Sequence, residues 1–291
     1  MKFLIVDAFT ETIFGGNPAG VVLIPDGEDY PDEETMVKTA AELRYSETAF
    51  VKCLGESEFQ TRYFTPAAEV DLCGHATIGT FCALAHLGII RDGDTVINHT
   101  LAGDLEINVS DGFVMMEMAT PEDLGTLGDK EAIEELYEIM GTQYDPEKID
   151  LVPRMISTGL PDIMMPLATQ EDLNAMEPDM KKLSELSERY NVVGVHAFTL
   201  DAEVGTTAHA RNFAPLYDID EEAATGTSSG AMTYYFYLNG VIEPNASCRF
   251  IQGEKMQRPS VILSQIRCEG DEVNIKVGGS AVVLAEGEIA L

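Results

Sequence analysis

The sequence predicts an α+β protein with two pseudo-symmetric lobes, each a central helix wrapped by mostly antiparallel strands. The first observation is a repeated pattern at residues 62–77 and 211–229, where a strand ends at a proline and a glycine turn then opens a helix. The second is that most other apolar segments are short, β-like and separated by turn residues. The regular strand–helix alternation typical of a parallel sheet does not occur, which favours α+β.

The first half is expected to form a β-rich lobe around one helix. That helix follows Gly74, carries Ile78, Phe81, Cys82 and Ala85 on one face, and stops at Gly88. Strands are expected at residues 2–8, 19–24, 48–54, 59–65, 95–98, 104–109 and 112–118, with another helix from about 31 to 44. The segment Gly15-Gly16-Asn17-Pro18 is interpreted as a turn or loop between the first two strands.

The second half repeats this organisation after a change of composition near residue 119. Helices are expected at about 129–141, 178–190 and 227–238, and strands at 152–157, 163–167, 193–200, 206–213, 248–252, 259–267, 272–277 and 281–285. We therefore expect an N-terminal lobe of residues 1–118 plus about 281–291 and a C-terminal lobe of 119–280, with the active site in the cleft between them.

The composition excludes some classes of partner. With 18 Lys and Arg against 50 Asp and Glu, the net charge is −32, which argues against binding to nucleic acid or to an anionic membrane. Two explanations for the acidity stay open: adaptation to a salt-rich cytoplasm, or a surface selected for solubility. The five cysteines form no Cys-x-x-Cys pair, and no long apolar run occurs. Because the first residues soon become acidic, we expect no signal peptide. We expect a cytoplasmic protein.

Three side chains of the first half are candidates for chemistry. Glu47 precedes an apolar strand and is either an acid or base near neutral pH or a solvent-exposed acid at a helix end. His75 follows the glycine turn and either shuttles a proton and binds a carboxylate or serves as a cap or core residue. Cys73 is either a base at a helix N-terminus or a small buried residue, and its counterpart Thr225 cannot act as a second thiol.

The second copy of the pattern offers hydroxyl groups in place of the thiol and imidazole. Thr227 and Ser228 either bind an anion together with the N–H groups that open the helix, or only cap it. The glycines here form neither a P-loop nor a dinucleotide-binding fingerprint. The histidines show no ligand spacing and no His, Cys and acid cluster is visible, so we expect no metal and no cofactor.

A series of motifs along the chain resembles the phenazine-biosynthesis PhzF-like family. The motifs are Asp7-Ala8-Phe9-Thr10, Phe14-Gly15-Gly16-Asn17-Pro18, Ser46-Glu47-Thr48-Ala49-Phe50, Phe64-Thr65-Pro66, Cys73-Gly74-His75-Ala76-Thr77, Ser157-Thr158-Gly159-Leu160-Pro161, Arg211-Asn212-Phe213-Ala214-Pro215, Ala224-Thr225-Gly226-Thr227 and Gln252-Gly253-Glu254. They run in order from residue 7 to about 287. The resemblance implies a fold like those of diaminopimelate epimerase and proline racemase, two lobes around a cofactor-free cleft, and usually a homodimer.

The resemblance also implies roles for particular residues. A glutamate matching Glu47 moves a proton in the isomerisation of a small cyclic carboxylic acid, and a histidine matching His75 supports it. Glu222 and Thr227 stand where the family has aspartate and serine, so the shape of the pocket should differ. We expect these four residues to be catalytic. Substrate contacts are expected from Asn17, Cys73, Gly74, Ala76, Gly226 and Ser228.

The sequence thus predicts an isomerase or epimerase of a small carboxylate, with Glu47 transferring the proton. Two alternatives stay open. One is a non-catalytic small-molecule binding protein with the same cleft, and the other is a racemase that depends on Cys73.

Overall fold

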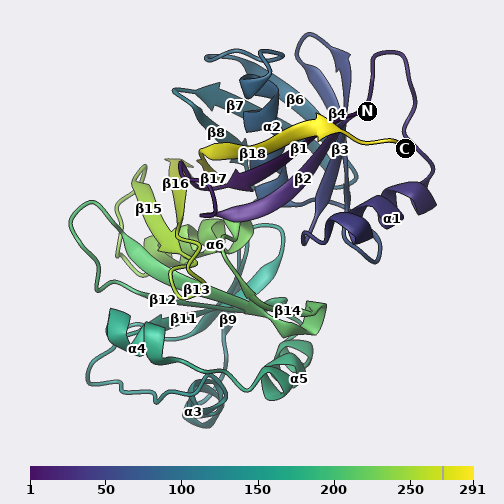
Figure 1. The fold of residues 1–291 in the computed structure, drawn as a ribbon. Coiled ribbons are helices and arrows are strands. Elements are labelled where there is room, and N and C mark those ends of the chain that lie inside the picture. The colour runs from purple at the N-terminus through teal and green to yellow at the C-terminus, as the bar shows by residue number, and fades with distance from the viewer. Residues whose placement is uncertain (271) are drawn as a thin grey trace. The chain divides into compact units, whose positions relative to one another are not determined.

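The chain forms two compact units, each with a central helix packed on its strands. In the computed structural model, which describes residues 1–270 and 272–291, unit 1 comprises Met1–Glu117 and Gly278–Leu291. Unit 2 comprises Met118–Val277. Figure 1 shows the chain entering unit 2 after β8 and returning to unit 1 with β18.

The sheet of unit 1 has the order β18-β1-β2-β3-β4-β6-β7-β8, with the short β5 also paired to β4. Its strands are β1 (Lys2–Ala8), β2 (Asn17–Leu23), β3 (Thr48–Gly55), β4 (Glu58–Phe64), β5 (Glu69–Val70), β6 (Thr95–Thr100), β7 (Gly103–Ser110), β8 (Phe113–Glu117) and β18 (Ala281–Glu288). Helix α1 (Glu33–Leu43) packs on β3 and β4, while α2 (Gly74–His86) contacts β1, β2, β3, β8 and β18.

Helix α2 is the centre of unit 1 because nearly every side chain on it is small or apolar. Residues from His75 to Phe81 are buried without a break, so the helix is covered on all sides. A helix that is apolar all round belongs in the interior rather than on a surface. Cys73, His75 and Ala76 at the N-terminal end of the helix are buried as well.

Unit 2 repeats this arrangement with the strand order β9-β10-β11-β12-β13-β15-β16. Its strands are β9 (Glu122–Thr126), β10 (Arg154–Ser157), β11 (Pro161–Leu167), β12 (Gly194–Thr199), β13 (Ala208–Ala214), β14 (Ile219–Glu222), β15 (Ser247–Gln252) and β16 (Ser260–Glu269). The strand β17 (Glu272–Gly279) begins in unit 2, and its last two residues belong to unit 1. Helix α6 (Gly226–Leu238) packs on β10, β11 and β16. Helices α3 (Lys130–Ile139), α4 (Gln170–Ala175) and α5 (Met180–Tyr190) lie on the other side of the unit 2 strands, as Figure 1 shows.

The two units share details of strand pairing as well as order. The pair β2–β3 is parallel, and so is β11–β12 at the same place in unit 2. The pairs β4–β6 and β13–β15 are likewise parallel. A register shift interrupts β1–β18 between Ile5 and Val6, and a matching shift interrupts β10–β9 between Met155 and Ile156. The repeat seen in the sequence therefore extends over the whole topology of both sheets.

The strand and helix positions differ from the sequence prediction mainly at short elements. Asn17 and Pro18 lie inside β2 rather than in a turn, so that prediction is wrong. The turn is made just before them at Gly16, whose φ is 62° and whose missing Cβ leaves room for the carbonyl oxygen of Ala8. The elements β5, β9, β14 and α4 were not predicted, because each is six residues or fewer.

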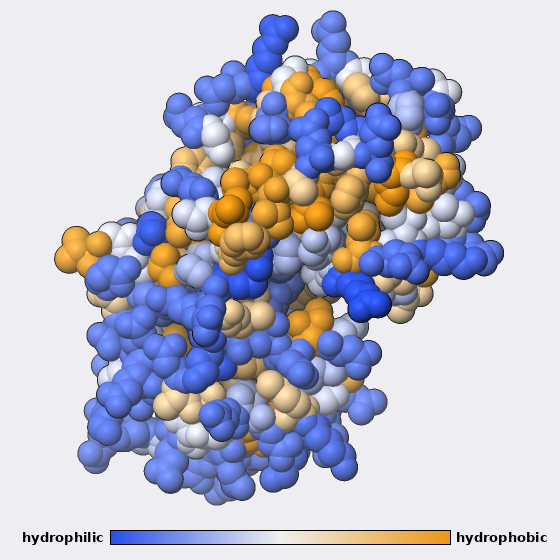
Figure 2. Space-filling model, in the orientation of Figure 1, coloured by the Kyte–Doolittle hydropathy of each residue, from blue (hydrophilic) through white to orange (hydrophobic). Residues whose placement is uncertain are grey.

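The surface reflects the acidic composition. Figure 2 shows hydrophilic residues over most of the face drawn for unit 2, while apolar residues gather over part of unit 1. Among the described residues, no helix is both long enough and apolar enough to cross a membrane.

Candidate functional site

Glu47 lies in the connection between α1 and β3, one residue before the strand. Its backbone carbonyl accepts a hydrogen bond from the N–H of Gly20 over 3.3 Å, which ties this connection to β2. The side chain is 14% exposed and its Oε2 atom lies 3.3 Å from Nε2 of His75. Oε2 is buried and accepts no hydrogen bond within the described residues. The acid is therefore held against the imidazole and not in open solvent.

His75 and Cys73 come from the first turn of α2. Cys73 is the N-cap residue, with extended backbone and no side-chain cap, and His75 is the second helical residue. The thiol sulfur lies 3.4 Å from Nδ1 and 3.9 Å from Nε2 of His75. The hydroxyl oxygen of Ser46 lies 3.3 Å from Nε2. The imidazole is only 4% exposed and lies between a carboxylate, a hydroxyl and a thiol.

A buried hydrogen-bond network fixes the start of α2. The Thr77 hydroxyl donates to the carbonyl of Cys73 over 2.7 Å and lies 2.6 Å from the Tyr63 hydroxyl. The Asn98 amide donates to the same tyrosine oxygen over 3.2 Å, and Thr61 donates to Asn98 over 2.7 Å. Burial raises the pKa of Tyr63, so it stays neutral. Sequence reasoning missed this network because its members come from two strands, β4 and β6, and from α2.

The arrangement in unit 1 suits proton transfer near a bound anion. A carboxylate beside an imidazole can accept a proton and pass it on within hydrogen-bond reach. The first turn of a helix carries backbone N–H groups and partial positive charge, which favour a carboxylate ligand. Gly74 and Ala76 flank His75 in this turn, and Ala76 is fully buried.

The candidate residues of unit 2 surround the first turn of α6. Thr225 is the N-cap residue without a side-chain cap, and Gly226 and Thr227 are the first two helical residues. The Thr225 hydroxyl donates to Glu222 Oε2 over 2.9 Å. Thr158 donates its hydroxyl to the carbonyl of Thr227 over 2.8 Å. Thr225 and Thr227 thus take the same positions on α6 that Cys73 and His75 take on α2.

Gln252, at the end of β15, holds the segment that carries Glu222. Its amide nitrogen donates to the carbonyl of Glu222 over 2.7 Å and to the Thr225 hydroxyl over 3.0 Å. Its amide oxygen accepts from the N–H of Thr225 over 3.2 Å. The next residue, Gly253, has φ of 80°, and a Cβ there would meet the carbonyl oxygen of Ala223 at 2.6 Å. Sequence reasoning quoted these residues as a motif but assigned them no role.

Ser228 is fully buried and its hydroxyl is engaged within unit 2. It donates to Asp162 Oδ2 and accepts from the Asn212 amide over 3.2 Å. The same amide nitrogen lies 3.2 Å from Nδ1 of His196. Burial raises the pKa of Asp162 to about 6 and lowers the pKa of His196 to about 3. The hydroxyl therefore supports the start of α6 from inside, which leaves little capacity for the substrate contact expected of it.

The sequence shows no cluster of His, Cys and acid residues, but the fold brings three such residues together. One ligand atom each from Glu47, Cys73 and His75 lie within 4.8 Å of one another. The spacing of residues in the sequence could not reveal this cluster, because Glu47 lies far from the other two residues. Asn17, the other candidate of unit 1, is buried at the start of β2.

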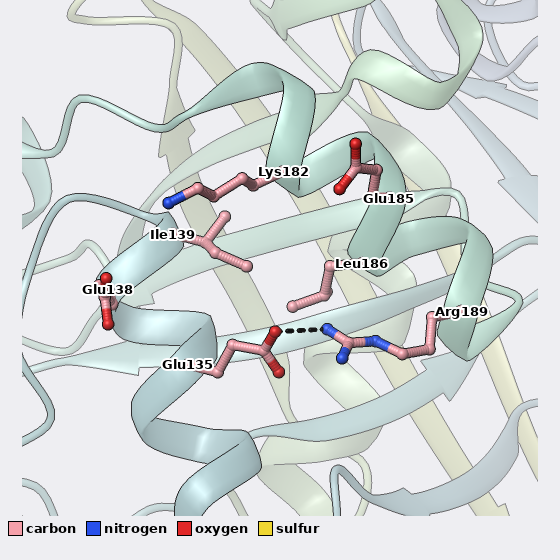
Figure 3. Close-up of a pocket in the computed structure, with 7 residues that line it drawn as sticks. All are labelled: Glu135, Glu138, Ile139, Lys182, Glu185, Leu186 and Arg189. Carbon is pink, nitrogen blue, oxygen red and sulfur yellow. Dashed lines mark hydrogen bonds and ion pairs between the residues drawn. The ribbon is translucent and has the colours of Figure 1, made fainter.

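A pocket elsewhere in unit 2 contains none of the candidate residues. It encloses about 560 Å³ between α3 and α5. Figure 3 shows its rim, where Arg189 pairs with Glu135 over 2.9 Å. The lining residues are Glu135, Glu138, Ile139, Lys182, Glu185, Leu186 and Arg189. Because residues of both charges line it on α3 and α5, we interpret this pocket as a solvated groove between two helices and not as a catalytic site.

Comparison with known proteins gives matches along almost the whole chain. A family model described as "Phenazine biosynthesis-like protein" matches residues 6–287. The chain is 32% identical to the "Uncharacterized isomerase YfhB" of Bacillus subtilis (strain 168), covering 95% of this chain and 94% of that protein. It is 28% identical to the "Trans-2,3-dihydro-3-hydroxyanthranilate isomerase" of Pseudomonas fluorescens, covering 100% and 99%.

Solved structures show the same similarity in three dimensions. The Bacillus anthracis phenazine biosynthesis protein of the PhzF family superposes with a TM-score of 0.88 at 28% identity, covering 100% of this chain and 99% of that one. A probable proline racemase from Agrobacterium radiobacter K84 superposes with a TM-score of 0.65 at 12% identity, covering 100% and 93%. The second likeness shows the fold alone: a mixed α/β fold with few helices, similar to that of racemases and epimerases.

Proposed function

Because the chain belongs to the phenazine biosynthesis-like family, whose curated relatives are named isomerases, we propose that it isomerises a small carboxylic acid by proton transfer through Glu47. The observation that carries this proposal is the buried contact of 3.3 Å between Glu47 Oε2 and His75 Nε2 at the start of α2. A carboxylate held there has a proton-transfer partner and a helix N-terminus beside it.

The reaction is a single proton moved within the substrate. The Glu47 carboxylate removes a proton from carbon, and the electron pair of the broken C–H bond delocalises into the adjacent unsaturated system. The resulting carboxylic acid, whose proton exchanges with water, then returns a proton to a different carbon, which restores Glu47 and leaves no net change in composition. His75 lies within reach to donate a hydrogen bond to the charge that develops between these two steps.

A carboxylate is the substrate class that the site supports best. The relative from Pseudomonas fluorescens is named for a hydroxyanthranilate, which is a carboxylic acid. The first turns of α2 and α6 have no side-chain cap, so an anionic ligand is a suitable partner for their N–H groups. Because the protein has a net charge of −32, local positive potential of this kind is needed to attract an anion.

Glu222 and Thr227 are proposed to set which carboxylate is accepted. The family pattern has aspartate and serine there, so this chain adds a methylene and a methyl group. Glu222 is held by Thr225 and Gln252, which fixes the position of the longer side chain. A narrower pocket would exclude substrates that the shorter residues admit, so we propose a substrate other than the hydroxyanthranilate of the named relative.

Proton exchange measured in D2O tests the mechanism. We expect deuterium to enter the isomerised product with the wild-type protein, and we expect Glu47→Gln to reduce this exchange by at least about 10²-fold. Gln keeps the shape of the side chain but cannot accept the proton. A Glu47→Gln protein that exchanges at the wild-type rate would rule out the mechanism. Binding of a carboxylate without exchange in the wild type would support a non-catalytic binding protein instead.

Cys73-dependent racemisation is the second candidate, favoured by the 3.4 Å contact between the thiol and His75 Nδ1. The variant Cys73→Ser separates it from the first, because the thiol is the base in the second mechanism only. Our proposal expects Cys73→Ser to retain most of the exchange, whereas the racemase predicts its loss. Cys53→Ser is the matched control, since Cys53 is exposed at the end of β3.

We also propose that the protein works as a homodimer in the cytoplasm, without a resident metal or nucleotide and without nucleic-acid partners. The acidic composition supports the absence of nucleic-acid partners, and the missing fingerprints support the absence of a nucleotide. Sedimentation equilibrium of the purified protein tests the dimer, and a single species of 31.7 kDa would contradict it.

A further inference from the structure

The side chains of Glu47, Cys73 and His75 offer a sulfur, a nitrogen and an oxygen ligand at one point. All three ligand atoms lie within 4.8 Å of one another, and the three side chains are buried or nearly so. Zn²⁺ is the divalent ion that takes thiolate, imidazole and carboxylate ligands together. A hard ion such as Mg²⁺ or Ca²⁺ would require several oxygen ligands, and this cluster supplies a single carboxylate.

The separation between the oxygen and nitrogen ligand atoms matches a tetrahedral zinc site, and the sulfur lies somewhat farther away. With Zn–N and Zn–O bonds of about 2.1 Å, the two ligand atoms of a tetrahedron lie about 3.4 Å apart. Glu47 Oε2 and His75 Nε2 are 3.3 Å apart. With a Zn–S bond of about 2.3 Å, sulfur and nitrogen lie about 3.6 Å apart, and the Cys73 sulfur is 3.9 Å from the same nitrogen. The sulfur lies closer to Nδ1, at 3.4 Å, so the Cys73 side chain must turn toward Nε2 to complete the third bond.

The backbone holds these three ligands in place before any ion arrives. Cys73 and His75 are fixed by the first turn of α2. Thr77 holds that turn through its hydrogen bonds to the Cys73 carbonyl and the Tyr63 hydroxyl. Glu47 is fixed through its backbone bond to Gly20. Its Oε2 is a buried acceptor that makes no hydrogen bond within the described residues and has only the 3.3 Å contact with His75, so a cation is a suitable partner for it. Three protein ligands also leave a fourth position for water.

We propose that Glu47, Cys73 and His75 form a zinc site, and that zinc bound there blocks the enzyme. The blocking part rests on the proposed function, because zinc would occupy the carboxylate oxygen that must take the proton. It would also hold the imidazole nitrogen that contacts Glu47. Zinc would therefore regulate this protein as an inhibitor.

Binding is tested directly by titrating metal-free protein with Zn²⁺ in competition with a chromophoric chelator. We expect one equivalent to bind to the wild type, and we expect Cys73→Ser to weaken binding by more than about tenfold because the thiolate ligand is lost. Cys53→Ser is the matched control and should bind like the wild type, since Cys53 is exposed and outside the cluster. Equal binding by Cys73→Ser and the wild type would overturn the site.

Three further measurements distinguish zinc binding at the site from inhibition of the enzyme by zinc. Co²⁺ in place of Zn²⁺ should give a thiolate charge-transfer band that Cys73→Ser lacks, and Zn²⁺ should protect Cys73 but not Cys53 from alkylation. Zinc should also abolish deuterium exchange, and a chelator should restore it. Stoichiometric zinc binding with unchanged exchange would overturn the inhibition alone. If the metal-free wild type shows no exchange with any carboxylate, the proposed function and the inhibition both fail, while the titration still decides the site.

Discussion

Arg211 and Glu221 form a two-point ion pair, in which Nε donates to Oε1 over 2.8 Å and Nη2 donates to Oε2 over 2.9 Å. Arg62 and Glu69 form the same pair at the matching place in unit 1, with both distances 2.6 Å. The remaining guanidinium nitrogen of Arg211, Nη1, also donates to the backbone carbonyls of Leu173 and Met176 at the end of α4. The duplication thus preserved an ion pair in which the arginine also lies over a phenylalanine ring.

The two pairs should differ in how much stability they provide. The Arg211 side chain is 6% exposed and that of Arg62 is 25% exposed, so loss of the carboxylate strands a more deeply buried charge in unit 2. We expect Glu221→Ala to lower the free energy of unfolding by about 3–5 kcal/mol, and Glu69→Ala by clearly less. Urea unfolding of both variants measures this. Equal losses would show that burial does not govern the difference.

His209 is held between two carboxylates and should make stability depend on pH. Its Nδ1 lies 2.6 Å from Glu254 and its Nε2 lies 2.9 Å from Glu203. Burial lowers the pKa of His209, but the hydrogen bonds and charges of Glu203 and Glu254 outweigh it, so the net pKa is raised. The stabilisation is therefore complete below pH 6.5 and is lost as the pH rises through the pKa in the folded state.

The same contact lowers the pKa of Glu203 to about 2, chiefly through its hydrogen bond to His209. This part of the stabilisation is present above about pH 4.5 and is lost as the pH falls toward 2. We expect His209→Gln to lower the melting temperature most near pH 5.5 and least near pH 9. His86→Gln is the control, because His86 is 53% exposed and lies 3.8 Å from its nearest acid. A pH-independent deficit in His209→Gln would contradict the account.

Asp162 should make the stability of the protein depend on pH in the direction opposite to that of an acid whose pKa is lowered on folding. Its pKa is raised to about 6 by burial, against which the hydrogen bond from Ser228 acts. An acid with a raised pKa stabilises the folded state when protonated, so this stability is present at low pH and is lost as the pH rises through 6. The full difference corresponds to ~3 kcal/mol.

Replacing the acid by its neutral amide removes this dependence. We expect the wild type to gain stability relative to Asp162→Asn as the pH falls from 7.5 to 5, because only the wild type takes up a proton there. Urea unfolding of both proteins at the two pH values gives the comparison. Unfolding curves that keep a constant separation at both pH values would refute the prediction.

The net charge of −32 predicts that salt stabilises the protein. The Debye length falls from about 10 Å at 0.1 M salt to about 3 Å at 1 M, so repulsion among surface carboxylates is screened. We expect the melting temperature to rise steadily with KCl over this range. A melting temperature that does not change would favour solubility as the reason for the acidity.

The sequence predicted the elements whose signal is local. Helix α2 was predicted within two residues because its glycine start, apolar periodicity and glycine stop are all contained in one short segment. Proline and glycine at the strand ends located β4 and β13 equally well. By contrast, the parallel pairs β2–β3 and β11–β12 could not be predicted, because strand direction depends on how the connecting helix crosses the sheet.

The candidate site was predictable only in part. Local patterns made Cys73 and His75 candidates, because both belong to one helix N-terminus. The contact between Glu47 and His75 required a family resemblance, since nothing in the spacing of two residues so far apart brings them together. Gln252 and Asp162 act through hydrogen bonds to residues 30 and 66 positions away, and no sequence pattern encodes such pairs.

The division of the chain between the units has a consequence for synthesis on the ribosome. Unit 2 is one uninterrupted segment, so it can fold as soon as it has been translated. Unit 1 must wait, because β18 follows all of unit 2 in the chain and pairs with β1 along the whole strand. Until then β1 is an unpaired edge in the nascent chain, a template for aggregation that binding by a chaperone would cover.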